Sequence, residues 1–433
     1  MSNNPYDQIP YRCQPIEWTA PERLAINSLL HGGPSPALKR YRVLELGCGD
    51  GANLLPMAYY RPQAEFVGVD GAARHIDLAQ SRLGQLNIDN LEFLHHDFRQ
   101  ANTHLMGKFD FIIAHGVFSW VPDGVRDALF HLCADRLSAN GLLYLNYNTK
   151  PGWNVRGMVR DYLLAHTRDQ ASLSEKLSTA RIAAAKMARS LTGETHPFSQ
   201  LLGNEFQFVC DNHDSYIAHE FLAEHNKAYW RSEFQALAAQ FDLHPVSDAD
   251  YNYPSGKVNP SLLKQMASQD LIGTSLDDTV DLISYRQLHT PILSKKSVDI
   301  PYPAPDALEQ LSVASCLHPA GPHKPNWYQH PSGYEVEAKE QPIADALNRL
   351  YPLWPNSAPL NVVLNNHQAF LDDLLLLHHN GLIEMRLPGG PLPLEGSGLN
   401  RLNQLEVQWA GDYTTPYHQR VENVRSSAAM EIA

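Results

Sequence analysis

The chain has 433 residues, a hydrophobic fraction of 43% and a formal net charge of -13, so we expect about two or three domains with substantial cores. The acidic balance disfavours nucleic acid as the main substrate, because binding to a phosphate backbone depends on clustered basic side chains. The polar first ten residues and the short apolar runs predict a cytoplasmic protein without membrane insertion.

Residues 1–40 are predicted to form an N-terminal cap segment. Thr19 and Glu22 have the spacing of a capping box, and Pro21 is tolerated in a first turn, so we expect a helix that ends near Leu30. This helix either closes over a ligand or only packs against the next domain. Tyr11 lies in a proline-bounded loop and is expected to reach the mouth of the active site.

A glycine-rich turn follows the first predicted strand, Arg42–Leu46, and precedes a predicted helix, Ala52–Tyr60. Gly47, Gly49 and Gly51 occupy every second position of this turn. Glycines let the backbone pass close to a ligand and expose N–H groups, with the positive end of a helix behind them. The turn therefore predicts a ligand site, although such turns serve several cofactors.

Four further predicted strands end in polar or aromatic residues. The strands are Glu65–Val69, Leu91–Leu94, Phe109–Ala114 and Leu142–Leu145. The residues after them are Asp70, then Asp97 and Phe98, then His115, and finally Tyr147 and Asn148. Helical stretches separate the strands, which predicts an α/β fold with a parallel, Rossmann-like sheet. Ligands bind such sheets at the carboxyl ends of the strands, where all these residues lie.

The glycine spacing favours one ligand class. A dinucleotide site has G-x-G-x-x-G, whereas this turn has G-x-G-x-G with Glu45 before it. The run from Glu45 to Gly51 resembles motif I of the class I S-adenosylmethionine (SAM) methyltransferases; a dehydrogenase is the alternative. The resemblance implies that Glu45, Gly47, Cys48 and Gly49 hold the methionine end of SAM. It further implies that Asp70 binds the ribose and that Asp97 and Phe98 contact the adenine.

The remaining chain divides by composition. We expect the SAM-binding core at 41–150, a helical insert or regulatory region at 151–295, a proline-rich linker at 296–335, and a C-terminal domain with a tail at 336–433. The strand-like Leu243–Tyr253 is either the last step of the sheet or part of a separate helical domain.

Helical patterns at Ile343–Tyr351, Leu360–Asn365 and Ala369–Leu377, with a strand at Leu382–Leu387, predict a winged-helix-like module in the C-terminal domain. Its third helix is acidic and apolar, which favours packing against protein over binding to DNA. The tail from Ser397 is polar, and we expect Ser426–Ala433 to be mobile.

Several segments outside the glycine turn resemble bacterial methyltransferases that carry a methyltransferase regulatory domain, with the rickettsial outer-membrane-protein lysine methyltransferases as the nearest group. The matching segments are Tyr6–Tyr11, Asn53–Ala58, Gly116–Pro122, Tyr147–Asn154, Phe221–Asn226, Leu311–Ser315 and Leu353–Pro355. The resemblance implies SAM as cofactor, S-adenosylhomocysteine (SAH) as product and a protein lysine as acceptor.

Candidate acceptor residues follow the fourth and fifth strands. Tyr11, Phe118, Trp120, Tyr147 and Trp153 are predicted to line the acceptor pocket. Tyr147, His115 and Asn148 are the catalytic candidates, since a protonated lysine must lose a proton before methyl transfer. For Phe118 and Trp120, core packing is an equal alternative. His115 is expected to contact the cofactor, more through its backbone carbonyl than as a base.

No catalytic metal is expected. His95 and His96 are adjacent on a strand and face opposite sides, and the five cysteines have no paired metal spacing. Two other functions remain open, namely a small-molecule methyltransferase and a non-catalytic SAM-binding scaffold. The expected partners are a protein or peptide substrate and, as an open question, a second copy of the chain.

Overall fold

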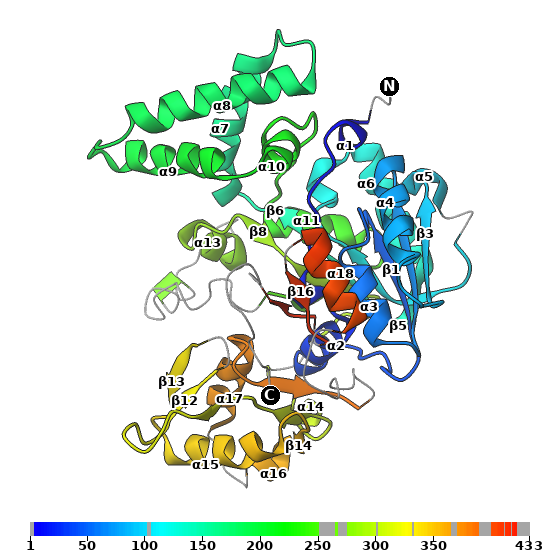
Figure 1. The fold of residues 1–433 in the computed structure, drawn as a ribbon, viewed down its shortest axis with the longest axis vertical. Helices are drawn as coiled ribbons and strands as arrows, with labels where there is room; N and C mark the ends of the chain where they lie inside the picture. The colour runs from blue at the N-terminus through cyan, green and yellow to red at the C-terminus, as the bar shows by residue number, and fades with distance from the viewer. Residues whose placement is uncertain are drawn as a thin grey trace.

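The computed structural model describes residues 4–101, 105–250, 265–266, 275–299, 302–330, 333–364, 370–388, 400–410, 412–416 and 418–421. Three parts are visible in Figure 1: a sheet with helices on both faces, a group of long helices that projects from it, and a C-terminal unit of short strands and helices. In the part of the chain that the structure describes, no helix is long and apolar enough to span a bilayer.

A seven-stranded sheet forms the centre of the first part and has the order β3-β2-β1-β4-β5-β9-β7. Its strands are β1 (Arg42–Leu46), β2 (Glu65–Asp70), β3 (Leu91–His95), β4 (Phe109–Ala114), β5 (Leu137–Leu145), β7 (His244–Asp248) and β9 (Pro291–Ser294). The first five strands are parallel. Strand β9 pairs antiparallel with both β5 and β7. This confirms the predicted Rossmann-like α/β fold.

The strand predicted near Leu243 belongs to this sheet, which settles the alternative left open above. Helix α11 (Arg231–Ala239) leads into β7 at the sheet edge. Strand β9 was not predicted. Its four residues are all buried, and so short an apolar run cannot be assigned from sequence periodicity.

Helices cover both faces of the sheet because alternate strand residues point to opposite sides. In β1, Val43 belongs to one hydrophobic core, and Leu44 and Leu46 belong to the other. The covering helices are α2 (Pro21–Leu30), α3 (Leu54–Tyr60), α4 (Ala73–Leu83), α5 (Phe98–Ala101), α6 (Asp123–Arg136) and α11.

The predicted end of the N-terminal helix at Leu30 is confirmed, but its capping box is wrong. The N-cap is Ala20, which has no side-chain oxygen to accept a bond from the helix. Thr19 instead ends the short 3₁₀-helix η1 (Glu17–Thr19), and its hydroxyl donates to the Ile16 carbonyl.

The projecting helices are inserted between β5 and α11 and form a cap with its own apolar core. They are α7 (Gly152–Thr167), α8 (Leu173–Ser190), α9 (Pro197–Asp211), α10 (Asp214–Tyr216) and the π-helical turn η3 (Ile217–Phe221). Figure 1 shows α7, α8 and α9 stacked together, away from the sheet. The two short strands β6 (Tyr147–Asn148) and β8 (Leu288–His289) pair near the base of this cap.

The C-terminal unit contains more regular structure than the predicted proline-rich linker allows. Helix α14 (Pro305–Leu308) and strands β10 (Ser312–Ala314), β11 (His318–Pro319) and β12 (Trp327–Gln329) lie within residues 296–335. Strand β10 pairs antiparallel with β14 (Ala358–Pro359) and β15 (Glu384–Arg386), and β12 pairs with β13 (Glu335–Glu337). The linker prediction failed there because strands of two or three residues are too short to show an alternation of apolar and polar residues.

Three predicted helices of this unit are present as α15 (Gln341–Leu350), α16 (Leu360–Leu364) and α17 (Leu371–His379). Gly381 follows α17 with a φ of +69°, a conformation that glycine adopts readily just after a helix. The winged-helix assignment stays a prediction.

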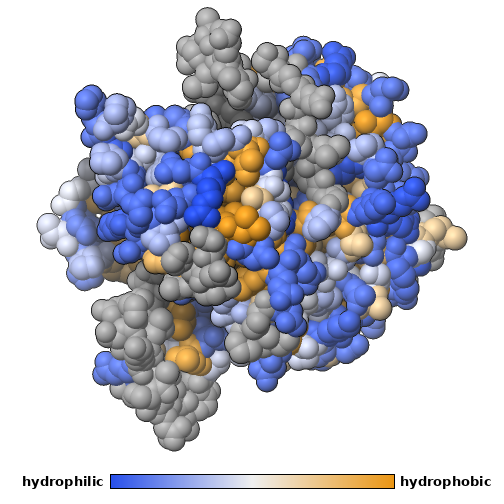
Figure 2. Space-filling model, turned by 90° about the horizontal axis from the view of Figure 1, so that it is seen from below, coloured by the Kyte–Doolittle hydropathy of each residue, from blue (hydrophilic) through white to orange (hydrophobic). Residues whose placement is uncertain are grey.

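Figure 2 shows the surface of the molecule from the end at which the C-terminal unit lies. Hydrophobic side chains gather near the middle of this mostly hydrophilic face.

The last described segment returns to the sheet domain, which corrects the expectation of a polar tail attached to the C-terminal module. Helix α18 (Arg401–Ala410) is followed by β16 (Tyr413–Thr414) and β17 (Arg420–Val421). Leu402 and Leu405 are buried in the same core as α3. The predicted mobile end, Ser426–Ala433, lies outside the described residues.

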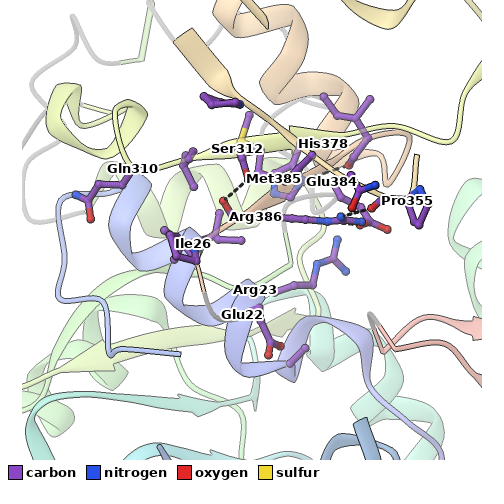
Figure 3. A pocket seen from close by; sticks show the side chains of 18 of the residues that line it. Glu22, Arg23, Ile26, Gln310, Ser312, Pro355, His378, Glu384, Met385 and Arg386 are labelled. Atoms are coloured by element: carbon purple, nitrogen blue, oxygen red, sulfur yellow. Dashed lines mark hydrogen bonds and ion pairs between the residues drawn. The ribbon is translucent and has the colours of Figure 1, made fainter. Parts of the chain in front are cut away.

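A cavity of about 450 Å³ is lined by residues of α2 and of the C-terminal unit. Figure 3 shows Arg23 and Ile26 of α2 on one side, and Met385 and Arg386 of β15 on the other. None of the predicted site residues lines it.

Candidate functional site

The glycine turn has the backbone that its sequence predicts. Gly47, Gly49 and Gly51 have φ values of +79°, +53° and +78°, a region that other residues rarely adopt. The N–H groups of Gly47 and Cys48 both donate to the Val69 carbonyl, at 2.8 and 3.2 Å. These bonds hold the turn against the end of β2, beside Asp70.

Asp70 is fixed by backbone groups on both sides. Its Oδ2 accepts from the Gly49 N–H at 2.9 Å, and its Oδ1 accepts from the Ala72 N–H at 2.8 Å. His75 Nδ1 lies 3.7 Å from Oδ1. The carboxylate therefore has one orientation at the carboxyl end of β2, and part of it remains exposed to a ligand.

Glu45 is a buried carboxylate beneath the turn. Its Oε1 accepts from Asn53 Nδ2 at 2.7 Å, while Oε2 has no hydrogen-bond partner among the described residues. Burial raises the pKa of Glu45 to about 8. A buried carboxylate with a free oxygen suits a ligand that brings a positive charge or N–H donors.

Asp97 and Phe98 lie at the end of β3. The Asp97 carboxylate accepts from the Arg99 backbone N–H at 2.9 Å and also binds the Arg99 side chain, which holds its pKa below the usual value. The ring of Phe98 is half-buried against the core. Their adenine contact stays a prediction.

His115 follows β4 and is held by Tyr144, which the sequence reasoning missed. The Tyr144 hydroxyl accepts from Trp18 Nε1 at 2.9 Å and lies 2.8 Å from His115 Nδ1. The Tyr144 hydroxyl can donate to Nδ1 or accept from Nδ1–H, so either neutral tautomer of His115 makes this hydrogen bond. Burial lowers the pKa of His115 to about 4. The imidazole is therefore neutral and held by Tyr144, and the contact of His115 with the cofactor through its backbone carbonyl stays a prediction.

Tyr147 and Asn148 lie deeper than predicted. The Tyr147 ring is 2% exposed and stacks on Phe234 with centroids 4.1 Å apart. The Asn148 N–H donates to Ser119 Oγ at 2.8 Å, and its Nδ2 has no partner among the described residues. These contacts are those of core packing. A catalytic role for either residue stays a prediction.

The predicted acceptor residues fall into separate groups. Trp120 and Trp153 meet edge to face with centroids 5.7 Å apart, and Trp153 Nε1 donates to Asn226 at 2.8 Å. Phe118 is fully buried against Phe130 and Phe234, as its packing alternative required.

The N-terminal segment 4–16, called the strap below, passes over the glycine turn and contains Tyr11. A Cβ on Gly49 would lie 2.3 Å from Cys13 Sγ. The Tyr11 N–H donates to His75 Nε2 at 3.2 Å, which places the strap beside Asp70. The cap contacts it from the other side, since His219 Nε2 lies 2.6 Å from the Ile9 carbonyl oxygen.

The chain is similar in sequence to known proteins. The family described as Methyltransferase domain matches residues 43–141, the segment from β1 into β5. Protein RP028 of Rickettsia prowazekii is 30% identical over 229 residues, which cover 53% of this chain and 91% of that protein. The chain belongs to the class I SAM-dependent methyltransferases. Protein RP789 of the same organism is 34% identical over 300 residues, and the methyltransferase spans only 54% of its length.

Solved structures extend the likeness in fold. PKMT2 from Rickettsia typhi superposes with a TM-score of 0.76 at 22% identity, over 95% of this chain and 86% of that one. Its complex with AdoHcy, the SAM product SAH, gives 0.75. The likeness therefore includes the cap and the C-terminal unit as well as the sheet.

The site of the methyltransferase fits SAM, the cofactor of its family. The free Oε2 of Glu45 suits the ammonium of the methionine end, and the contact of Asp70 with the ribose stays a prediction. Sequence reasoning selected Glu45 because it precedes the glycine turn and Asp70 because it stands at the end of the second strand. It missed His75 and His219, which lie on helices without a motif.

Proposed function

We propose that this methyltransferase uses SAM to methylate lysine side chains of a protein substrate. The observation that carries the proposal is the position of Asp70, which is locked to the glycine turn on one side and faces the strap on the other. The strap therefore covers the cofactor site. The named relative PKMT2 is a lysine methyltransferase, which favours a protein acceptor.

The residues of the site have separable roles. Glu45 binds the ammonium of the methionine end of the cofactor, and Asp70 binds the hydroxyls of its ribose. The strap excludes water from the turn, because Cys13 covers Gly49 and Tyr11 is tied to His75. When bound, SAM supplies a methyl group on a sulfonium. The protein then needs to present a neutral amine in line with it, so that positioning supplies much of the acceleration.

The experiment is to incubate the protein with methyl-labelled SAM and a cell lysate, and then to separate proteins from small metabolites. We expect label in proteins, on lysine residues identified by mass spectrometry. Label confined to metabolites would reject the protein acceptor and favour a small-molecule methyltransferase. The Asp70→Ala variant is the control for transfer that does not need the site.

A further inference from the structure

The last described part of the chain, residues 400–410, 412–416 and 418–421, is called the C-terminal segment below. Figure 1 shows its α18 and β16 beside α3, the helix that follows the glycine turn. It lies outside residues 43–141, which match the methyltransferase family. It nevertheless contributes a buried histidine, His418, which is 1% exposed and has a φ of +63°. Residues other than glycine seldom adopt this conformation and keep it where the surrounding structure fixes them.

The His418 side chain meets Asn53, the N-cap residue of α3. His418 Nε2 lies 2.7 Å from Asn53 Oδ1, and the Ile16 N–H donates to the same oxygen at 2.9 Å. A backbone N–H can only donate, so this atom of the amide is its oxygen, and His418 presents an N–H on Nε2. Burial lowers the pKa of His418 well below its ordinary value, so the imidazole is neutral. Its Nδ1 has no hydrogen-bond partner among the described residues, which leaves Asn53 to orient the ring.

Asn53 connects His418 to Glu45. Its Nδ2 donates to Glu45 Oε1 at 2.7 Å and to Thr19 Oγ1 at 3.1 Å. A side-chain amide has two N–H donors and an oxygen that accepts two hydrogen bonds, and all four positions of Asn53 are occupied. Asn53 is 5% exposed, so the loss of one partner would leave a buried polar group without its hydrogen bond. The four bonds therefore fix the amide, and the amide fixes one oxygen of Glu45.

The C-terminal segment is also bonded to the strap. Arg420 Nη1 donates to Gln14 Oε1 at 2.7 Å, and Arg12 Nη2 donates to the Ala410 carbonyl at 3.4 Å. Ile16, which shares the oxygen of Asn53 with His418, is the last residue of the strap. The strap and the C-terminal segment therefore meet at the amide that holds Glu45.

We propose that His418 is a positioning residue for the cofactor, which acts through Asn53 to hold Glu45 toward the ammonium of the methionine end. The inference rests on the proposed function, because that function assigns this ammonium to Glu45. Without His418, one lone pair of Asn53 Oδ1 is buried without a donor, the amide is free to turn, and Glu45 loses its fixed position. The C-terminal segment thus completes a cofactor site whose other assigned residues lie within residues 4–115.

Two substitutions of His418 test the hydrogen bond, with SAH binding to the full-length protein measured by calorimetry. His418→Ala removes the donor and should weaken SAH binding by about three- to tenfold, the contribution of one hydrogen bond. His418→Gln keeps an N–H donor and should bind SAH within about twofold of the wild type. Gln419→Ala is the matched control and should bind normally, because Gln419 is the next residue and lines the cavity beside α2 instead. Wild-type affinity in His418→Ala, or an equal loss in either of the other two variants, would overturn the proposal.

A second ligand separates positioning from a general disturbance of the fold. 5′-Methylthioadenosine has the adenosine and the sulfur of SAH but no amino acid, so its binding does not require Glu45. We expect His418→Ala to weaken the binding of SAH and to leave that of 5′-methylthioadenosine within about twofold. An equal loss for both ligands would overturn the proposal.

A double-mutant cycle tests whether His418 acts through Glu45. In a Glu45→Gln background, His418→Ala should change SAH affinity by less than about twofold, because two residues that act on one contact are not additive. Full additivity would overturn the proposal. If Glu45→Gln weakens SAH binding and His418→Ala does not, only the role of His418 fails. If Glu45→Gln binds SAH as the wild type does, the role of Glu45 fails and the inference fails with it. SAH binding needs no acceptor, so none of these outcomes depends on whether a protein lysine is methylated.

Discussion

Asp70 Oδ2 accepts a hydrogen bond from the Gly49 N–H at 2.9 Å, which joins the carboxyl end of β2 to the glycine turn after β1. This bond makes one unit of two segments that are 21 residues apart. The strap packs on this unit, and the C-terminal segment packs on α3, the helix that follows the turn. The predictions below test the parts of this arrangement separately.

Replacing Asp70 with Asn should weaken SAH binding by about tenfold or more, because a hydrogen bond to a charged group contributes about 1.5–3 kcal/mol. Isothermal titration calorimetry measures the change. Glu65→Gln is the control, since Glu65 opens the same strand and its side chain is 69% exposed. A wild-type affinity in Asp70→Asn would show that Asp70 does not contact the cofactor.

Gly49→Ala should displace the strap, because its Cβ would meet Cys13 Sγ at 2.3 Å and its φ of +53° costs about 1 kcal/mol for a residue with a Cβ. We expect weaker SAH binding in Gly49→Ala, near-normal binding in Cys13→Gly, and partial recovery in the double variant. A double variant no better than Gly49→Ala alone would mean that Cys13 does not cover the turn.

The raised pKa of Glu45 predicts that stability and SAH binding both depend on pH, each in a definite direction. The pKa of Glu45 is about 8 in the folded protein against an ordinary value of 4.5, so the folded apo protein holds a proton that the unfolded chain releases between these values. Its contribution to stability is complete below pH 4.5 and is lost as the pH rises through 8. The ammonium of SAH should lower this pKa, so binding at pH 7 should release a proton.

Calorimetry of SAH binding in buffers with different ionisation enthalpies counts that proton. Glu45→Gln should release up to one proton fewer than the wild type. The Glu406→Gln variant is the matched control, because burial also raises the pKa of Glu406, to about 7, at a position on α18. Identical proton release by the wild type and Glu45→Gln would exclude Glu45 as the partner of the ligand ammonium.

The return of the C-terminal segment predicts that α18 stabilises the catalytic domain. Leu405 is 2% exposed and lies in the core shared with α3, so Leu405→Ala should lower the free energy of unfolding by about 2–5 kcal/mol. Leu353→Ala, at a position 42% exposed, should change it by less than about 1 kcal/mol. Denaturant unfolding followed by tryptophan fluorescence gives both values. Equal stabilities of the two variants would contradict the packing of α18.

The sheet and its polar edge were predictable because each depends on local sequence. Strand β1 is an apolar run that ends in glycines, and Asp70 follows β2 at the distance that a parallel sheet requires. The edge of the sheet at which a cofactor is expected could therefore be predicted before any contact was known. Cys13 on Gly49 could not, because that contact joins a loop to a turn without a shared pattern.

Two differences between the expected and the observed positions have physical causes. Leu402, Leu405 and Trp409 have helical spacing, but the surrounding polar residues concealed a short apolar stripe that packs on α3. Tyr147 was chosen as an acceptor contact from its place after a strand, yet its ring faces Phe234 in the core. The position of a residue after a strand shows at which edge of the sheet it lies. The direction of its side chain depends on packing against residues that are distant in the sequence.

Calorimetric titration of the full-length protein with SAH tests the central claim most directly, because it asks whether the edge of the sheet beside Asp70 is a SAM site. We predict one SAH bound per chain in the wild type and an affinity at least tenfold lower in Asp70→Ala. A folded wild-type protein that gives no binding heat with SAH, and no thermal shift in its presence, would contradict the account.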